Sequence, residues 1–155
     1  MEAFQEEKHL DYSGAPPERT MHEGAGRKLE VAVLFTSPAP TIAAARRAAK
    51  LIEGLDGRIT LIEAEAIPYC LPIDRPPVSL AFTKRRLLRL AQESGIAMAV
   101  HVFLCRFKYE ALLQLLSPGA LIVIGCRKTV WPCWEKRLGR KLRNAGYQTI
   151  LIEST

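Results

Sequence analysis

Residues 120–146, ALIVIGCRKTVWPCWEKRLGRKLRNAG, decide the fold class of this chain. Their first six residues form an apolar run, which is typical of a strand buried on both faces. A basic loop follows Gly125, and the next segment places Trp134, Leu138 and Leu142 at helical spacing on one face. Residues 147–153, YQTILIE, then return to an apolar run. This order of strand, loop, helix and strand predicts a parallel βαβ unit.

The same alternation extends over the chain from residue 29. We expect strands at residues 29–37, 58–68, 96–107, 120–125 and 147–153, and helices at 41–57, 78–95, 108–119 and 134–146. Alternating strands and helices with right-handed crossovers give a mostly parallel sheet covered on both faces. We therefore predict an α/β fold: a single doubly wound sandwich with a five-stranded parallel sheet, in the order 3-2-1-4-5, and helices on both faces.

The chain is expected to contain one domain and a tail. Residues 1–28 include Pro-Pro and several glycines without apolar periodicity, and are interpreted as a disordered or loosely attached tail. Residues 29–155 are interpreted as the α/β domain. No apolar run approaches the roughly 18 residues that a membrane span needs. Acidic residues stand where an export signal would be basic and apolar, so we expect a cytoplasmic protein.

The distribution of charge and cysteine narrows the function classes. The chain has 22 Lys and Arg against 16 Asp and Glu, for a net charge of +6. A basic folded body favours an anionic partner, but without an interleaved aromatic platform we expect no specific nucleic acid. The scattered cysteines show no metal-ligand spacing and are expected to be free thiols: Cys70, Cys105, Cys126 and Cys133.

The predicted topology directs attention to two loops. Open α/β sheets bind ligands at the carboxyl ends of the strands, where the strand order changes direction, here between the first and fourth strands. The loops at this point are TSPAPT (36–41) and GCRKTVWPCW (125–134). Glycine after a strand and basic residues beyond it are features of a phosphate-binding turn. The candidate anion- or nucleotide-binding residues are Thr36, Ser37, Ala64, Gly125, Arg127, Lys128 and Thr129.

Three segments of this sequence resemble the universal stress protein family: VAVLFTS, RITLIEAEAIP and above all PGALIVIGCRK…LRNAGYQTILIE. The likeness covers residues 29–153 and rests on element order and the terminal block. It implies a five-stranded Rossmann-like sandwich, a role in the stress response, and a homodimer paired through the last strand. The dimer edge implied here is Thr149, Ile150, Leu151 and Ile152.

Some members of that family bind ATP, through an aspartate at the end of the first strand and Gly-x2-Gly-x9-Gly-Ser/Thr after the fourth. Here Phe35 or Thr36 stands at the aspartate position. Gly125 matches the first glycine, Lys128 replaces the second, and Leu138 falls at the third. Counting back from the last strand puts Glu135-Lys136 at the third position instead, so the loop is shortened. We therefore expect no ATP binding in the usual family manner.

Two interpretations of this loop stay open at the sequence level. The basic residues and a helix N-terminus form an altered pocket for a nucleotide (ATP, AMP or a cyclic dinucleotide) or another phosphorylated molecule. Alternatively, they form a solvated basic face, with Trp131 and Trp134 filling the vacated pocket or stacking there. No Ser/His/Asp arrangement, carboxylate pair or metal triad can be assembled, so enzyme activity is not expected.

Three functions follow as expectations. The first is a small regulatory or scaffolding protein that forms a homodimer. The second is a sensor that holds a phosphorylated small molecule at the basic loop. The third is a regulatory module that docks on a membrane transporter or sensor kinase, where a basic face suits acidic protein loops or anionic lipid.

Overall fold

The computed structural model describes residues 28–154. The tail predicted at residues 1–28 lies outside this range except for Lys28, so its boundary stays a prediction. Within the described range, no helix combines the length and the apolar character that crossing a bilayer requires.

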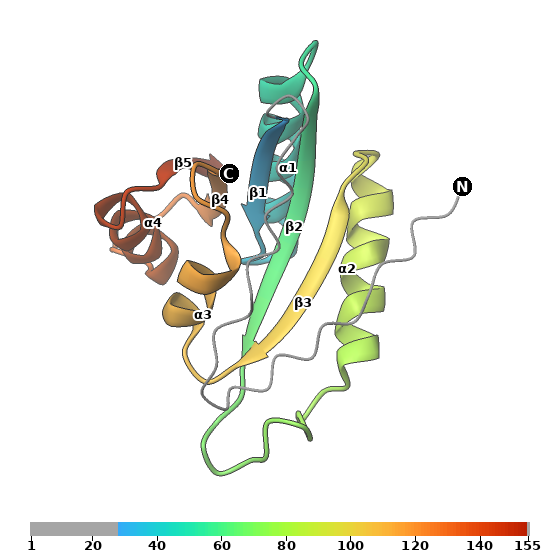
Figure 1. Cartoon of the computed structure of the whole chain (residues 1–155), viewed down its shortest axis with the longest axis vertical. Coiled ribbons are helices and arrows are strands. Elements are labelled where there is room, and N and C mark those ends of the chain that lie inside the picture. Colours follow the sequence, from blue (N-terminus) through green and yellow to red (C-terminus); the bar gives the residue numbers. More distant parts are fainter. Residues whose placement is uncertain (1–27, 155) are drawn as a thin grey trace.

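Five strands alternate with four helices in the part of the chain that the structure describes (Figure 1). The strands are β1 (Leu29–Leu34), β2 (Gly57–Ala66), β3 (Ala99–Cys105), β4 (Leu121–Arg127) and β5 (Gln148–Ser154). The helices are α1 (Pro38–Ile52), α2 (Leu80–Ser94), α3 (Lys108–Leu115) and α4 (Trp134–Asn144). The strands form one sheet in the order β3-β2-β1-β4-β5, and every pair is parallel. The predicted fold class and strand order are confirmed.

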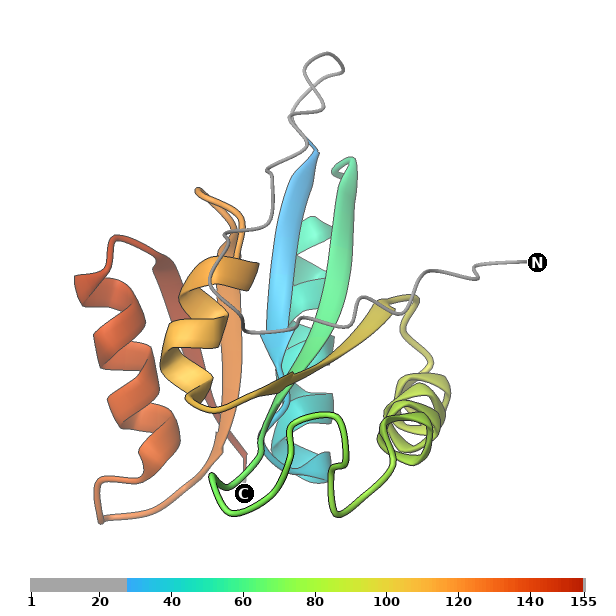
Figure 2. The same cartoon turned by 60° about the horizontal axis from the view of Figure 1, so that its bottom comes forward.

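The sheet lies between two helical layers, with α1 and α2 on one face and α3 and α4 on the other (Figures 1 and 2). Alternate residues of β1 separate into two cores: Val31 and Val33 pack beneath α1 and α2, and Ala32 and Leu34 beneath α3 and α4. The strands read as continuous apolar runs because both faces of a parallel sheet are covered.

The start of α1 differs from the sequence prediction. The helix begins at Pro38 after Ser37, three residues before residue 41, where we expected it to begin. Proline is tolerated in the first turn because the N–H groups there have no partner within the helix. β1 correspondingly ends at Leu34 instead of Ser37. The earlier turn brings the first residues of α1 close to the carboxyl end of β4.

Candidate functional site

The candidate site is the carboxyl edge of the sheet between β1 and β4. These strands are neighbours, with Leu34 opposite Ile124. The chain leaves β1 toward α1 on one face of the sheet and leaves β4 toward α4 on the other (Figure 2). This divergence is the switch point at which open α/β sheets commonly form a ligand crevice.

Thr36 uses its donors inside the protein at this point. Its hydroxyl donates to the carbonyl oxygen of Gly125 at 2.8 Å, which joins the end of β1 to β4. Its backbone N–H donates to the hydroxyl oxygen of Thr41 at 3.2 Å, and Thr41 is buried with 1% of its surface exposed. We predicted that Thr36 would donate to a ligand. In the structure its hydroxyl and its N–H instead bond to other residues of the chain and join the two sides of the crevice.

Gly125 is required here for close packing. A Cβ atom at this position would lie 2.0 Å from the backbone oxygen of Pro40, far inside van der Waals contact. The first turn of α1 therefore lies directly against the backbone of β4. The sequence pattern suggested a glycine that admits a phosphate, whereas in the structure a helix of the same chain takes up that space.

The other predicted ligand residues do not converge on one pocket. Ser37 precedes α1 and makes no side-chain capping bond. Ala64 is buried in the core beneath α3 and α4. Arg127 and Lys128 are exposed, and the N–H of Lys128 bonds to the carbonyl of Ser154 at 3.1 Å. Among the predicted residues, the structure brings Thr36 together with Gly125, places Arg127 at the end of β4, and places Lys128 and Thr129 in a separate outward loop.

The two tryptophans differ in exposure, and Trp131 does not fill the crevice. Trp131 has 81% of its surface exposed, and Trp134 has 45% exposed. The Nζ of Lys108 lies 5.4 Å from the centre of the Trp134 ring, a cation–π contact at the surface. The prediction that these indole rings plug a vacated pocket is therefore wrong for Trp131. The backbone contact between α1 and β4 has already taken up the space.

The loop after β4 is held by contacts at its base. The ammonium of Lys136 donates to the carbonyl of Thr129 at 3.3 Å and pairs with the carboxylate of Glu153 at 2.8 Å. The hydrogen bond from Lys136 lowers the pKa of Glu153, and the same bond raises the pKa of Lys136. The hydroxyl oxygen of Thr129 accepts from the N–H of Trp131 at 3.2 Å. The loop is thus tied to β5 and α4.

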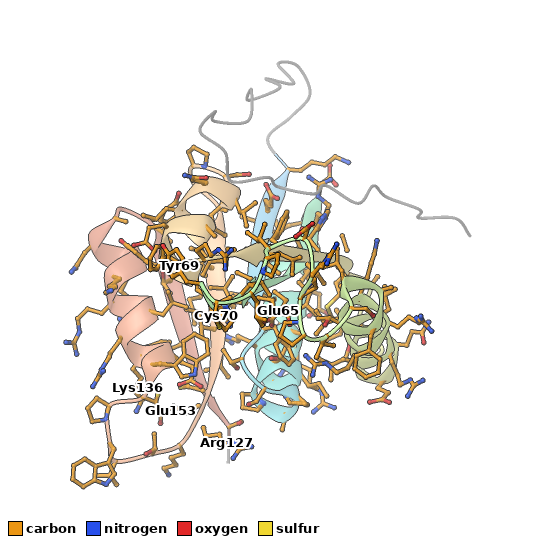
Figure 3. All side chains as sticks on the ribbon, turned by 90° about the horizontal axis from the view of Figure 1, so that it is seen from below. Glu65, Tyr69, Cys70, Arg127, Lys136 and Glu153 are labelled. Atoms are coloured by element: carbon orange, nitrogen blue, oxygen red, sulfur yellow. The ribbon has the colours of Figure 1, made fainter. Side chains whose placement is uncertain are left out.

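A second cluster of polar contacts holds the connection from β2 to α2. The guanidinium of Arg106 donates to the carbonyls of Ile67, Pro68 and Leu71 at 3.1, 2.6 and 2.9 Å. It also lies 5.2 Å from the centre of the exposed Tyr69 ring. Figure 3 labels Tyr69 and Cys70 on this connection, and Glu65 on the strand that precedes it.

Glu63 is a candidate functional residue that the sequence analysis missed. It is buried in β2 with 7% of its surface exposed, and its Oε1 lies 3.5 Å from Lys108 Nζ. Its Oε2 is the buried side-chain atom without a hydrogen-bond partner in the described part of the chain. Burial raises the pKa of this carboxyl above its usual value, and the charge of Lys108 opposes the rise. Its sequence signal is an acid within the apolar run RITLIEA.

β5 forms one edge of the sheet. Ile150, Leu151 and Ile152 are half-buried, and the guanidinium of Arg143 donates to the carbonyl of Thr149 at 3.0 and 3.1 Å. The carbonyl of Ser154 points to β4, since it accepts from Lys128. Backbone groups alternate in direction along a strand. Those of Thr149, Leu151 and Glu153 therefore face outward.

The four cysteines are free thiols, as expected. Burial raises the pKa of the Cys126 thiol at the end of β4 and of the Cys105 thiol at the end of β3. A raised pKa keeps a thiol protonated, and the thiolate is the nucleophilic form. These two cysteines are therefore packing residues in the core.

Solved structures share this architecture. The universal stress protein from Archaeoglobus fulgidus is 14% identical, with a TM-score of 0.55 over 80% of this chain and 93% of that one. A protein from the universal stress protein family from Burkholderia pseudomallei is 18% identical, with a TM-score of 0.53 over 84% of this chain and 100% of that one. The chain has the universal stress protein fold. The resemblance seen in the sequence is confirmed at this level.

A third solved structure is the universal stress protein from Archaeoglobus fulgidus in complex with dAMP. It is 11% identical, with a TM-score of 0.48 over 82% of this chain and 97% of that one. No family model matches the sequence, and no curated protein matches it.

Proposed function

We propose that this protein is a small regulatory or scaffolding protein in the stress response, acting in the cytoplasm as a homodimer, without enzyme activity and without ATP at the switch point. The observation that carries the proposal is the hydrogen bond from Thr36 to Gly125. It bridges the two strand ends between which a ligand of this fold would enter.

The packing around that bond supports the same proposal. A phosphate-binding turn needs backbone N–H groups that are free to point at the ligand. Here the N–H of Thr36 is bonded to buried Thr41, and Gly125 is covered by Pro40. Opening the crevice would break two hydrogen bonds and separate α1 from β4. With the internal site closed, the outer surfaces are left to carry the function.

The proposed homodimer uses the outer edge of β5. A half-buried apolar strand with outward N–H and carbonyl groups is a ready template for pairing with a second copy. Ile150 and Ile152 lie on one face of this strand and Leu151 on the other. Two edges joined side by side would extend both cores across the interface. Arg143 covers the carbonyl of Thr149, so pairing would release this side chain.

Sedimentation of two proline variants tests the dimer. Thr149→Pro removes an outward N–H and leaves the ladder to β4 intact, since edge strands tolerate proline in that orientation. We expect the wild type to sediment as a dimer at micromolar concentration and Thr149→Pro as a folded monomer. Ile150→Pro is the matched control, because its N–H faces β4 and its loss should destabilise the fold itself. A monomeric wild type would reject the homodimer.

A second candidate function is that of a small-ligand sensor, and Glu63 favours it. An unpaired buried acceptor costs roughly 1–3 kcal/mol, which a donor on a ligand would recover. Glu63 lies toward the carboxyl end of β2, on the edge where ligands of this fold class bind. Such a ligand would offer a hydroxyl or amino group to Oε2.

Thermal unfolding with nucleosides, nucleotides and cyclic dinucleotides tests this candidate. A ligand present at 100 times its dissociation constant adds about 2.7 kcal/mol to the unfolding free energy. If Glu63 holds the ligand, Glu63→Gln weakens the effect and the double variant Arg127→Ala, Lys128→Ala keeps it. The reverse result would return the site to the basic loop that the sequence indicated. No shift with any of these compounds would count against the sensor.

A further inference from the structure

We propose that the loop between β4 and α4 docks this protein on an anionic lipid surface. We call residues 128–133, KTVWPC, the docking loop. In this proposal the side chains of Val130 and Trp131 enter the headgroup region of the bilayer, and the flanking basic residues contact anionic headgroups.

The tip of the docking loop is unusually apolar for an exposed turn. Val130 is 100% exposed and Trp131 81% exposed, and Pro132 beside them is also exposed. Figure 3 shows that the chain between Arg127 and Lys136 extends to the margin of the molecule. Single exposed apolar residues are common, but adjacent Val, Trp and Pro at a projecting tip form a contact surface. Tryptophan in particular favours the interface between water and lipid.

The base of the loop is ordered by the contacts already described. Lys136 bonds to Thr129 and to Glu153, and Lys128 pairs with Ser154 at the end of β5. These contacts join the loop to β5 and to α4. A tip fixed in an exposed position loses little conformational freedom on binding, which lowers the entropic cost of docking.

The charge around the tip favours an anionic surface. Residues 127–137 contain four basic residues and one acid, Glu135. Lys136 is paired with Glu153, whereas Arg127, Lys128 and Arg137 are exposed. Basic residues near an anionic membrane each strengthen binding, and the attraction falls off within a Debye length. The apolar tip and the cations that flank it are complementary to the interior and the headgroups of one bilayer leaflet.

The shape and the charge of the docking loop favour a lipid surface over other binding partners. A projecting tip needs either a matching groove or a deformable surface, and a bilayer deforms around it. A second copy of the chain would have to offer an acidic surface to this basic loop, and residues 29–155 carry only 10 Asp and Glu against 18 Lys and Arg. The proposal goes beyond the function proposed above. It is independent of the β5 dimer, since every residue that it uses belongs to one chain.

The two tryptophans of the chain provide the probe, because they are Trp131 and Trp134. The full-length Trp134→Phe variant leaves Trp131 as the single fluorophore. We would titrate it with vesicles of phosphatidylcholine alone and with vesicles that also contain phosphatidylserine. We expect the emission of Trp131 to shift to shorter wavelength, and to be quenched by brominated lipid, with the anionic vesicles.

Matched variants assign the binding to the docking loop. In the wild-type background, Arg127→Glu with Lys128→Glu should weaken partitioning by more than roughly 25-fold, since each basic residue contributes roughly fivefold and reversal also adds repulsion. The control is Arg46→Glu with Arg47→Glu, which changes the net charge equally on exposed positions of α1. Trp131→Ser should abolish partitioning, and Leu55→Ser, which changes an exposed leucine in another loop, should not.

Three results would overturn the proposal. The first is no spectral shift with anionic vesicles at low salt. The second is equal loss of binding in the Arg46/Arg47 control, which would show a nonspecific effect of net charge. The third is vesicle binding that survives Trp131→Ser, which would place the contact elsewhere. Circular dichroism of each variant would establish that it is folded before its vesicle binding is compared.

Discussion

The two loops at the switch point contrast with each other. The loop after β1 turns inward, where Thr36 bonds to Gly125 and to Thr41. The loop after β4 turns outward and exposes Val130 and Trp131. Both loops lie where this topology commonly forms a ligand crevice. The loop after β1 closes the crevice, and the loop after β4 points away from it into solvent. Topology therefore gives the location of a site, and the residues decide whether a crevice forms there.

Glycine is the residue that makes the inward loop possible. Gly125 allows the backbone of Pro40 to approach β4 at a distance that no side chain permits. A glycine in a phosphate loop allows the same close approach to a ligand. A glycine at this position can therefore admit a ligand or admit a helix of the same chain, and the neighbouring residues determine which of the two lies against it.

The largest expected effect is that of Gly125→Ala. A Cβ at this position meets backbone atoms that cannot move without displacing α1, so we expect destabilisation of about 3 kcal/mol or more. Gly139→Ala is the matched control: its Cβ would meet the flexible end of Leu151 at 3.1 Å. Urea denaturation measures both. Equal small effects would mean that α1 and β4 are not tightly packed.

Thr36→Val should have a smaller effect. It removes the hydroxyl and keeps the shape of the side chain, so the carbonyl of Gly125 loses its partner. We expect a loss of about 1–2 kcal/mol in urea denaturation. Thr129→Val is the control from the outward loop, where the loss should be smaller because the contact is at the surface. A reversed order of the two effects would contradict the contrast between the loops.

The smallest expected effect is a difference between Glu63 and Glu153 in how each changes the stability of the protein with pH. Burial raises the pKa of Glu63 above 4.5, so its ionisation opposes folding as the pH rises through and above that value. Lys136 lowers the pKa of Glu153 below 4.5, so this carboxylate stabilises the fold above that value and the stabilisation is lost as the pH falls.

From acid to neutral pH, the unfolding free energy relative to the wild type should therefore change in opposite directions for variants of these two residues. Relative to the wild type, Glu63→Gln should gain stability as the pH rises, and Glu153→Gln should lose it. Urea denaturation at a series of pH values provides the comparison. Parallel slopes would show that Glu63 is not desolvated as the structure indicates.

The sequence was sufficient to predict the fold because its apolar runs and helical spacings are regular. Val31 and Val33 alternate with Ala32 and Leu34 between two cores, which is the pattern expected for a sheet buried on both faces. Element boundaries were less accurate. The start of α1 was misplaced because prolines at 38 and 40 read as a loop signal, although they are compatible with a first helical turn.

The site was predicted less well, because it depends on contacts between distant residues. Thr36 and Gly125 are 89 residues apart, and spacing alone does not reveal that one donates to the other. The loop that exposes Trp131 is held at its base by the bonds from Lys136 to Thr129 and Glu153, and the second of these joins residues of different elements. Glu63 belongs to no motif and lies in a strand whose apolar pattern is otherwise regular, so the sequence does not mark it as a site residue. An acidic residue within an otherwise apolar strand is a sequence signal by which such a residue could be found in similar proteins.

Thermal unfolding of the wild-type protein with millimolar ATP tests the central claim most directly. If the contact of Thr36 with Gly125 closes the crevice, the unfolding midpoint should be the same with and without ATP. A midpoint that rises with ATP concentration would contradict the claim, because stabilisation by a ligand requires binding to the folded state. If that rise persists in Glu63→Gln, the inward loop opens in solution and the crevice admits a nucleotide.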